Sequence, residues 1–268
     1  MPTTDLTFAG SIPALYDRYL GPLIFAGYAA DLAARAAALR PTRVLETAAG
    51  TGIVTRALRA ALPEAVEIVA TDLNQPMLDH AAKVAPLAGV AWQQADALAL
   101  PFADASFDVV ACQFGAMFFP DKVAGYREAR RVLRPGGTFL FNVWDRLEDS
   151  ELPHEVSQAM GRHFQEDAPR FLERTPHGYF DRPRIEADVA AAGFHDVRME
   201  TVTHRSRATS ARDAAIAFCQ GTPLRNELER LAPGRLEELT DLAAAALAAR
   251  FGAGPIEGKI QAIVVTAS

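Results

Sequence analysis

The chain has 268 residues, half of them hydrophobic, so it is long enough to bury a substantial core in one large domain or one domain with an insertion. It carries 27 Lys and Arg against 33 Asp and Glu, a net charge of −6, and no basic block stands out, which argues against a nucleic-acid partner. No apolar stretch approaches the roughly 20 residues that span a bilayer, and residues 1–10 lack a signal-peptide pattern, so we expect a cytoplasmic protein without a membrane partner.

The two cysteines, Cys112 and Cys219, lie far apart in the sequence and form no pairing pattern. They indicate neither a disulfide framework nor a zinc site, and both are interpreted as buried thiols. We therefore expect no metal ion in this protein.

Residues 1–40 precede the first predicted strand and carry apolar residues at helical spacing, with Tyr16 and Tyr19 among them. One interpretation is an amphipathic helix packed on the domain. The other is an N-terminal helical cap or lid, in which Gly21 and Pro22 break the helix and turn it back across a ligand pocket. In the second case Tyr16 would cover a bound ligand and exclude water.

Residues 41–145 alternate between strand and helix patterns. The predicted strands cover residues 43–48, 66–72, 90–96, 107–114 and 138–144, and the predicted helices cover residues 52–62, 74–85 and 122–133. We interpret residues 133–137 as a turn between a helix and the fifth strand. This alternation predicts a parallel sheet with helices on both faces, in which ligands bind outside the carboxyl ends of the strands.

The pattern loosens after residue 145, where residues 146–182 are expected to form a cap insertion and residues 183–268 the last part of the sheet with a helical insertion. We predict helices at 150–164, 182–194, 210–220, 224–231 and 234–251, a loop at 165–180, and strands at 195–205 and 259–267.

The first predicted strand ends in Glu46, and Gly50 and Gly52 form the turn into the next helix. A dinucleotide would place its pyrophosphate at that helix N-terminus, where a neighbouring carboxylate is repulsive, and Thr55 replaces the third glycine of the dinucleotide pattern. S-adenosylmethionine carries an ammonium and a sulfonium group but no phosphate, so Glu46 complements its charge. The loop therefore favours S-adenosylmethionine over a nicotinamide cofactor.

Two further carboxylates follow the second and third strands. Asp72 is expected to accept hydrogen bonds from ribose hydroxyls. Asp96 is expected to accept from the adenine amine while the backbone N–H of Ala97 faces a ring nitrogen. Leu73 and Met77 offer apolar contacts to the adenine faces. Acidic residues at the ends of three successive strands indicate an adenosyl cofactor site more specifically than any one of these residues does alone.

These features together resemble the class I S-adenosylmethionine-dependent methyltransferases, in the branch that acts on small molecules. The resemblance covers residues 11–145 and is carried by residues 44–52, 99–110, 109–114 and 131–137. It implies an α/β fold with a doubly wound, mostly parallel, seven-stranded, Rossmann-like sheet and a helical cap. The implied strand order is 3-2-1-4-5-7-6, with strand 7 antiparallel.

The resemblance also implies which residues line the cofactor pocket. They are Glu46, Ala48, Ala49, Gly50, Gly52, Asp72, Asp96, Gln113 and Phe114. Ala48 stands where the family usually has its first glycine, and a methyl group fits there if the backbone angles are ordinary, which is our expectation for this position. We interpret Phe118 and Phe119 as packing groups at a corner of the chain.

The expected reaction transfers the sulfonium methyl group to a nucleophile and forms S-adenosylhomocysteine, with positioning as the main source of catalysis. An acceptor that must lose a proton would benefit from a general base. The candidates are His154 and His177, with Tyr16, Tyr19 and Tyr179 as orienting groups.

The residues after the fourth strand also bear on the acceptor. They lack the Asn/Asp-Pro-Pro-aromatic pattern of enzymes that methylate adenine or glutamine amino groups. A small, partly hydrophobic metabolite is the expected acceptor, and the protein is expected to be a monomer or homodimer. The alternative function is a non-catalytic S-adenosylmethionine-binding sensor or partner subunit.

Overall fold

The computed structural model describes residues 12–84 and 87–268, and the prediction made for residues 1–10 lies outside this part of the chain. Seven strands form one sheet in the order β3-β2-β1-β4-β5-β7-β6, which confirms the predicted fold class and strand order. The first five strands pair in parallel, and β7 runs antiparallel to both β5 and β6. The strands are β1 (Arg43–Glu46), β2 (Glu67–Asp72), β3 (Val90–Gln94), β4 (Phe107–Gln113), β5 (Leu133–Trp144), β6 (Val197–Ala208) and β7 (Ile256–Ala267).

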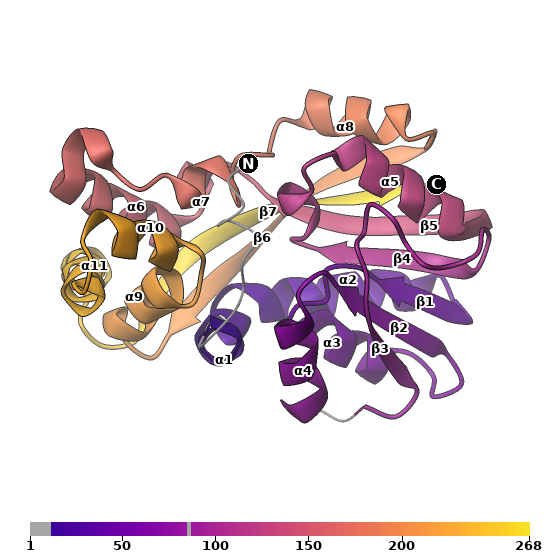
Figure 1. The fold of residues 1–268 in the computed structure, drawn as a ribbon, viewed down its shortest axis with the longest axis horizontal. Helices are drawn as coiled ribbons and strands as arrows, with labels where there is room; N and C mark the ends of the chain where they lie inside the picture. Colours follow the sequence, from indigo (N-terminus) through magenta and orange to yellow (C-terminus); the bar gives the residue numbers. More distant parts are fainter. Residues whose placement is uncertain (1–11, 85–86) are drawn as a thin grey trace.

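Helices cover both faces of the sheet because the buried strands carry apolar side chains on both sides. In β1, Val44 packs into one apolar cluster with α2 and α3, whereas the adjacent Leu45 packs into the cluster on the opposite face. Figure 1 shows α2 and α3 on one side of the sheet and α5 and α8 on the other. The helices that accompany the sheet are α2 (Ala26–Ala38), α3 (Ile53–Ala61), α4 (Gln75–Val84), α5 (Lys122–Val132) and α8 (Arg182–Ala191).

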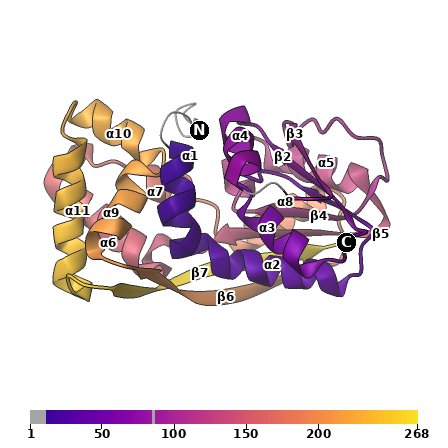
Figure 2. The same cartoon turned by 90° about the horizontal axis from the view of Figure 1, so that it is seen from below.

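A group of helices gathers at one end of the molecule, where β6 and β7 extend beyond the rest of the sheet (Figures 1 and 2). β5 pairs with β7 only as far as Trp144 and Ala262, whereas β6 and β7 stay paired to Ala208 and Ile256. The helices of this cap are α6 (Glu151–Phe164), α7 (Phe171–Arg174), α9 (Ala211–Gln220), α10 (Leu224–Leu231) and α11 (Leu236–Phe251). The extended β6–β7 ribbon thus connects the cap to the sheet.

The N-terminal segment is helical without interruption, so the predicted break at Gly21 and Pro22 is wrong. It runs through α1 (Ile12–Leu15), the π-helix η2 (Tyr16–Phe25) and α2. The Ala26 N–H donates to the Gly21 carbonyl, five residues back, which is the π-helical spacing. The wider turn leaves room for the Pro22 ring, which would clash with a carbonyl in an α-helix. Tyr28 then fixes α2 to the ribbon, because its hydroxyl donates to the carbonyls of Val202 and Ile260.

Two further predictions need correction. The predicted loop at 165–180 contains the short helices η5 (Gln165–Asp167) and α7, where Phe171 and Leu172 bury their side chains in the core. The predicted turn at 133–137 belongs to β5, which begins at Leu133 and shifts register against β4 before Thr138. Gly136, at φ 79°, provides the left-handed residue that such an irregularity uses.

Candidate functional site

In the loop between β1 and α3, every second residue from Ala48 to Gly52 has a left-handed backbone conformation. Ala48, Gly50 and Gly52 have φ values of 54°, 56° and 78°. The expectation of ordinary angles at Ala48 is therefore wrong, and a residue with a Cβ is held there at a cost of about 1–2 kcal/mol. Backbone held in such a region by its surroundings is common at binding sites.

The Ala48 methyl group lies against a glycine at the end of β4. A Cβ built on Gly115 would lie 2.4 Å from the Ala48 Cβ, so only glycine fits at residue 115. Gly115 was not predicted as a site residue, because its role depends on this approach of two loops that follow different strands. It begins the turn into η3 (Ala116–Phe118).

Asp72 ties the glycine loop to the end of β2. Its Oδ2 accepts a hydrogen bond from the Gly50 N–H at 2.8 Å, and its Oδ1 accepts from the Asn74 N–H at 2.8 Å. The side chain is 7% exposed, and burial raises its pKa. Oδ1 also accepts from the Asn74 side-chain amide at 3.4 Å, so Oδ2, with a single hydrogen bond, is the oxygen that can still accept from a ligand.

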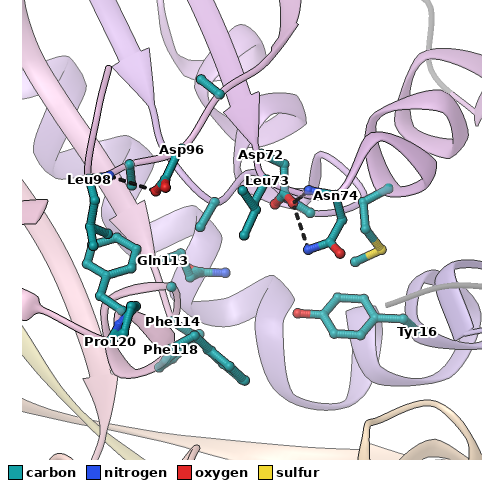
Figure 3. Close-up of a pocket in the computed structure, with 17 residues that line it drawn as sticks. Tyr16, Asp72, Leu73, Asn74, Asp96, Leu98, Gln113, Phe114, Phe118 and Pro120 are labelled. Atoms are coloured by element: carbon teal, nitrogen blue, oxygen red, sulfur yellow. Dashed lines mark hydrogen bonds between the residues drawn. The ribbon is translucent and has the colours of Figure 1, made fainter. Parts of the chain in front are cut away.

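A cavity of about 320 Å³ opens beside these residues, at the carboxyl ends of β1–β4 (Figure 3). We call it the large cavity. Ten of the predicted cofactor residues line it: Tyr16, Ala48, Gly50, Asp72, Leu73, Met77, Asp96, Ala97, Gln113 and Phe114. Its other lining residues are Asn74, Ala95, Leu98, Gly115, Phe118, Phe119 and Pro120. The structure therefore brings together residues that the sequence distributes over more than a hundred positions.

Three predicted residues, Glu46, Ala49 and Gly52, do not line this cavity. Glu46 is 1% exposed and accepts a hydrogen bond of 2.6 Å from the Thr55 hydroxyl. Burial raises the pKa of this carboxyl to about 8, with a smaller contribution from Asp72 in the same direction. Gly52 faces Trp92 instead, since a Cβ there would lie 2.6 Å from the indole ring.

The polar residues on the opposite wall have defined partners. Asp96 is exposed and accepts a hydrogen bond from the Leu98 N–H at 2.9 Å, as Figure 3 shows. Gln113 donates to the Phe25 carbonyl and accepts from Asn142, both at 3.4 Å. The Gln113 amide is thus oriented by groups outside the cavity.

Two aromatic rings mark the inner end of the large cavity. Phe114, at φ 50°, stacks on Trp144 with ring centroids 3.6 Å apart. Tyr16 stacks on Phe25 at 4.9 Å, and its hydroxyl points into the cavity in Figure 3. Burial raises the pKa of Tyr16, as do the charges of Asp72 and Asp17, so the phenol stays protonated.

A second, smaller cavity of about 60 Å³ adjoins the first. We call it the apolar chamber. Tyr16, Phe114 and Phe118 line both cavities, and the remaining walls come from η2, β5, α7, α9 and the residues after α9. Within the described residues, no charged side chain lines the chamber. Two of its lining residues, Tyr16 and Thr222, carry a hydroxyl, and that of Thr222 already donates to the Phe218 carbonyl and accepts from the Leu224 N–H.

Neither histidine proposed as a base lines either cavity. His154 lies within hydrogen-bond distance of Gln158 on the same helix. His177 is buried behind Trp144, with Nδ1 2.8 Å from the Asp145 carbonyl oxygen. Because a carbonyl only accepts, Nδ1 carries the hydrogen. Burial lowers the pKa of His177 to about 4, so the ring is neutral near pH 7. Tyr179, proposed as an orienting group, lines a third cavity described below.

Comparison with known proteins identifies the class that this fold and site define. Residues 45–141 match a family model described as a methyltransferase domain. The YcgJ protein of Bacillus subtilis has a similar structure, with a TM-score of 0.56 at 19% identity over 90% of this chain and 97% of that one. Together with the sequence relatives below, these matches show that the chain belongs to the class I S-adenosylmethionine-dependent methyltransferases.

Two curated relatives are more similar in sequence. A demethylmenaquinone methyltransferase of Thermus thermophilus is 36% identical over 194 residues, which are 65% of this chain and 82% of that protein. A demethylmenaquinone methyltransferase of Deinococcus radiodurans is 38% identical over 162 residues, which are 58% of this chain and 64% of that protein. In residues 12–84 and 87–268, no helix has the length and apolar character needed to cross a membrane.

Proposed function

We propose that the large cavity binds S-adenosylmethionine and that the apolar chamber holds the methyl acceptor. The observation that carries this proposal is the wall the two cavities share, formed by Tyr16, Phe114 and Phe118. A ligand in each cavity would meet at these three side chains. When bound, the cofactor supplies an activated methyl group, and its transfer to an acceptor carbon or oxygen leaves S-adenosylhomocysteine and one released proton.

The charge of the large cavity supports a cationic cofactor. Asp72 and Asp96 line it, and no Lys, Arg or His side chain of the described chain does. Glu46 adds a third carboxyl behind the glycine loop, where burial, more than the hydrogen bond from Thr55 or the charge of Arg56 can offset, raises its pKa to about 8. A pyrophosphate would find no positive partner here, whereas an ammonium and a sulfonium would favour ionised Glu46 and Asp72.

The predicted roles of the individual residues fit this arrangement. The Asp72 carboxylate, through Oδ2, accepts from the ribose hydroxyls, and Asp96 accepts from the adenine amine beside the Ala97 N–H. Leu73 and Met77 contact the adenine faces, which explains why Leu73 is 50% exposed although apolar. Tyr16 covers the inner end of the cofactor and separates it from solvent.

The apolar chamber determines the class of acceptor. Burying a charged group in this uncharged, aromatic-lined space would be costly, so the acceptor is an uncharged compound with an apolar ring. The names of the two curated relatives point to a demethylated naphthoquinol as the compound to test first. Because the chamber measures only about 60 Å³, the side chains of Tyr16 and Phe118 move when a ring enters.

Two measurements test the two halves of the proposal separately. Calorimetric titration should give saturable binding of S-adenosylhomocysteine and none of NAD at micromolar concentrations. Methyl-labelled S-adenosylmethionine should then label a reduced naphthoquinone that lacks the ring methyl group. Binding of NAD alone would overturn the cofactor assignment, and labelling of charged acceptors in preference to the quinol would overturn the acceptor assignment. Cofactor binding without any transfer in a metabolite extract would instead favour the sensor function.

A matched pair of variants tests the chamber. Ile24→Gln places an amide in its wall, so the KM for the quinol should rise at least tenfold while the affinity for S-adenosylhomocysteine stays unchanged. Leu39→Gln makes a similar change on an exposed side chain and should leave both values unaltered. An equal KM in the two variants would show that the acceptor binds elsewhere.

A further inference from the structure

A third cavity, of about 340 Å³, shares the lining residues Phe119 and Pro120 with the large cavity. Lys122, Arg174 and Arg184 line it together with Tyr179, and we call it the cationic cleft. In the part of the chain that the structure describes, no carboxylate lines it. Three cations around one cleft stand out in a chain with a net charge of −6.

Lys122 is held at the base of this cleft. Its ammonium donates to the carbonyls of Met117 and Phe119 at 3.2 and 2.9 Å, which leaves one N–H for a further acceptor. The nitrogen also lies 4.7 Å from the centre of the Tyr179 ring. Burial lowers the pKa of Lys122, the charge of Arg184 lowers it further, and the charge of Asp188 acts in the opposite direction without reversing the shift. The ammonium is therefore fixed in place beside a like charge.

Arg184 approaches the same aromatic ring, with its guanidinium carbon 5.6 Å from the ring centre. Its carboxylate partner, Asp188, is 4.0 Å away and already accepts a hydrogen bond of 2.8 Å from the Tyr179 hydroxyl. Arg174, the third cation, pairs with Glu227 at 2.7 Å. Glu227 is thus engaged by Arg174, and the single carboxylate of Asp188 faces both Lys122 and Arg184, which leaves this pair of cations with an excess of positive charge.

We propose that the cationic cleft binds the oxyanion of a small molecule, a phosphate or a carboxylate, between Lys122 and Arg184. An anion there would relieve the repulsion between these two cations and accept the remaining Lys122 N–H. The Tyr179 ring is 3% exposed and contacts both cations, so it holds them in place at the wall of the cleft. The site is separate from the large cavity and does not depend on the function proposed for it.

Titration of the protein with inorganic phosphate and with benzoate, at constant ionic strength, tests this site and separates the two kinds of oxyanion. The titration is done twice, once with saturating S-adenosylhomocysteine and once without it. With S-adenosylhomocysteine bound, the anions cannot enter the large cavity, so any binding occurs elsewhere. We expect saturable binding of at least one probe in both conditions. Binding that disappears when S-adenosylhomocysteine is added would place the anion in the large cavity and overturn the proposal.

Arg184→Gln removes one charge from an exposed side chain and should weaken the binding at least fivefold, whereas Arg184→Lys should retain most of it. The control Arg198→Gln removes the same charge from another exposed side chain, which pairs with Asp196, and should bind as the wild type does. Equal affinities in Arg184→Gln and Arg198→Gln, or no saturable binding of either probe to the wild type, would overturn the proposal.

Discussion

The large cavity and the apolar chamber share one wall but are built in different ways. The large cavity takes most of its residues from the first turns after β1, β2, β3 and β4, so each residue is positioned by the strand directly before it. The chamber is closed by segments that are distant in the sequence, with Leu20 and Ile24 from η2 facing Phe218 from α9. Local strand register positions the first cavity, whereas the docking of whole helices shapes the second.

This difference extends to the polar groups. In the large cavity, Asp72 lines the wall and its Oδ2 has a single hydrogen bond, from the Gly50 N–H. In the chamber, Thr222 and the buried His177 behind its wall are both satisfied by neighbouring backbone groups. The first arrangement suits recognition of a polar cofactor, and the second excludes water and charge. The following predictions test this contrast, from the largest expected effect to the smallest.

His177→Gln tests whether the histidine behind the chamber supports the structure. Its pKa is about 4 in the folded protein and near 6.5 when unfolded, so the stability it contributes is complete above pH 6.5 and is lost as the pH falls toward 4. Between pH 7 and pH 4, the free energy of unfolding of the wild type should fall by roughly 3 kcal/mol more than that of the variant. Urea denaturation at both pH values measures the difference.

Turnover of the same variant separates this role from catalysis. At pH 7.5 the variant should keep near wild-type turnover per folded molecule, because His177 lines neither cavity. A loss of about a hundredfold would return His177 to the role of general base.

Asp72→Asn tests the proposal that the large cavity binds the cofactor. Loss of the charge-assisted hydrogen bonds, worth roughly 1.5–3 kcal/mol, should weaken binding of S-adenosylhomocysteine about ten- to a hundredfold. The control is Asp79→Asn on α4, where the exposed carboxylate accepts a hydrogen bond from the Gln75 amide and lies outside the large cavity. If calorimetry gives the same affinity for both folded variants, Asp72 is not part of the cofactor site.

Tyr16→Ala acts on the wall that both cavities share. Since Tyr16 positions ligands on either side, we expect turnover to fall by about tenfold or more, with a smaller effect on the melting temperature than a core aromatic would have. Tyr16→Phe keeps the stacking on Phe25 and should retain most of the turnover. A large drop in melting temperature with normal turnover would show that the segment around Tyr16 supports the fold and does not position ligands.

Ala48→Gly tests the strained position in the glycine loop. Glycine at φ 54° removes a cost of about 1–2 kcal/mol but loses roughly 0.5–1 kcal/mol through chain entropy, so stability should rise slightly. Ala105→Gly is the matched control, because Ala105 is exposed at φ 53°. Thermal unfolding should show a smaller gain at residue 48 than at residue 105, since only Ala48 loses a methyl contact near Gly115. A larger gain at residue 48 would mean that its methyl group contributes no packing.

The sequence by itself determined the alternation of strands and helices, and with it the edge of the sheet where Asp72 and Asp96 lie. Strand ends and the glycine turn are local features, because the hydrophobic period of a strand and the residues of a turn can be recognised within a few consecutive positions. The order of the strands followed from the resemblance to the family, which the sheet confirms.

Only the tertiary structure decided the features that depend on contacts between distant residues. Pro22 predicted a break, yet the packing of η2 against α9 and β6 keeps the segment helical in a wider turn. Glu46 ends the first strand as predicted, but its carboxyl group accepts a hydrogen bond from Thr55 and does not line the large cavity. Residue 115 must be glycine because the Ala48 methyl group lies against it. The apolar chamber and the cationic cleft both arise where helices dock on the sheet, and that docking is set by the complementarity of whole surfaces rather than by any short stretch of sequence.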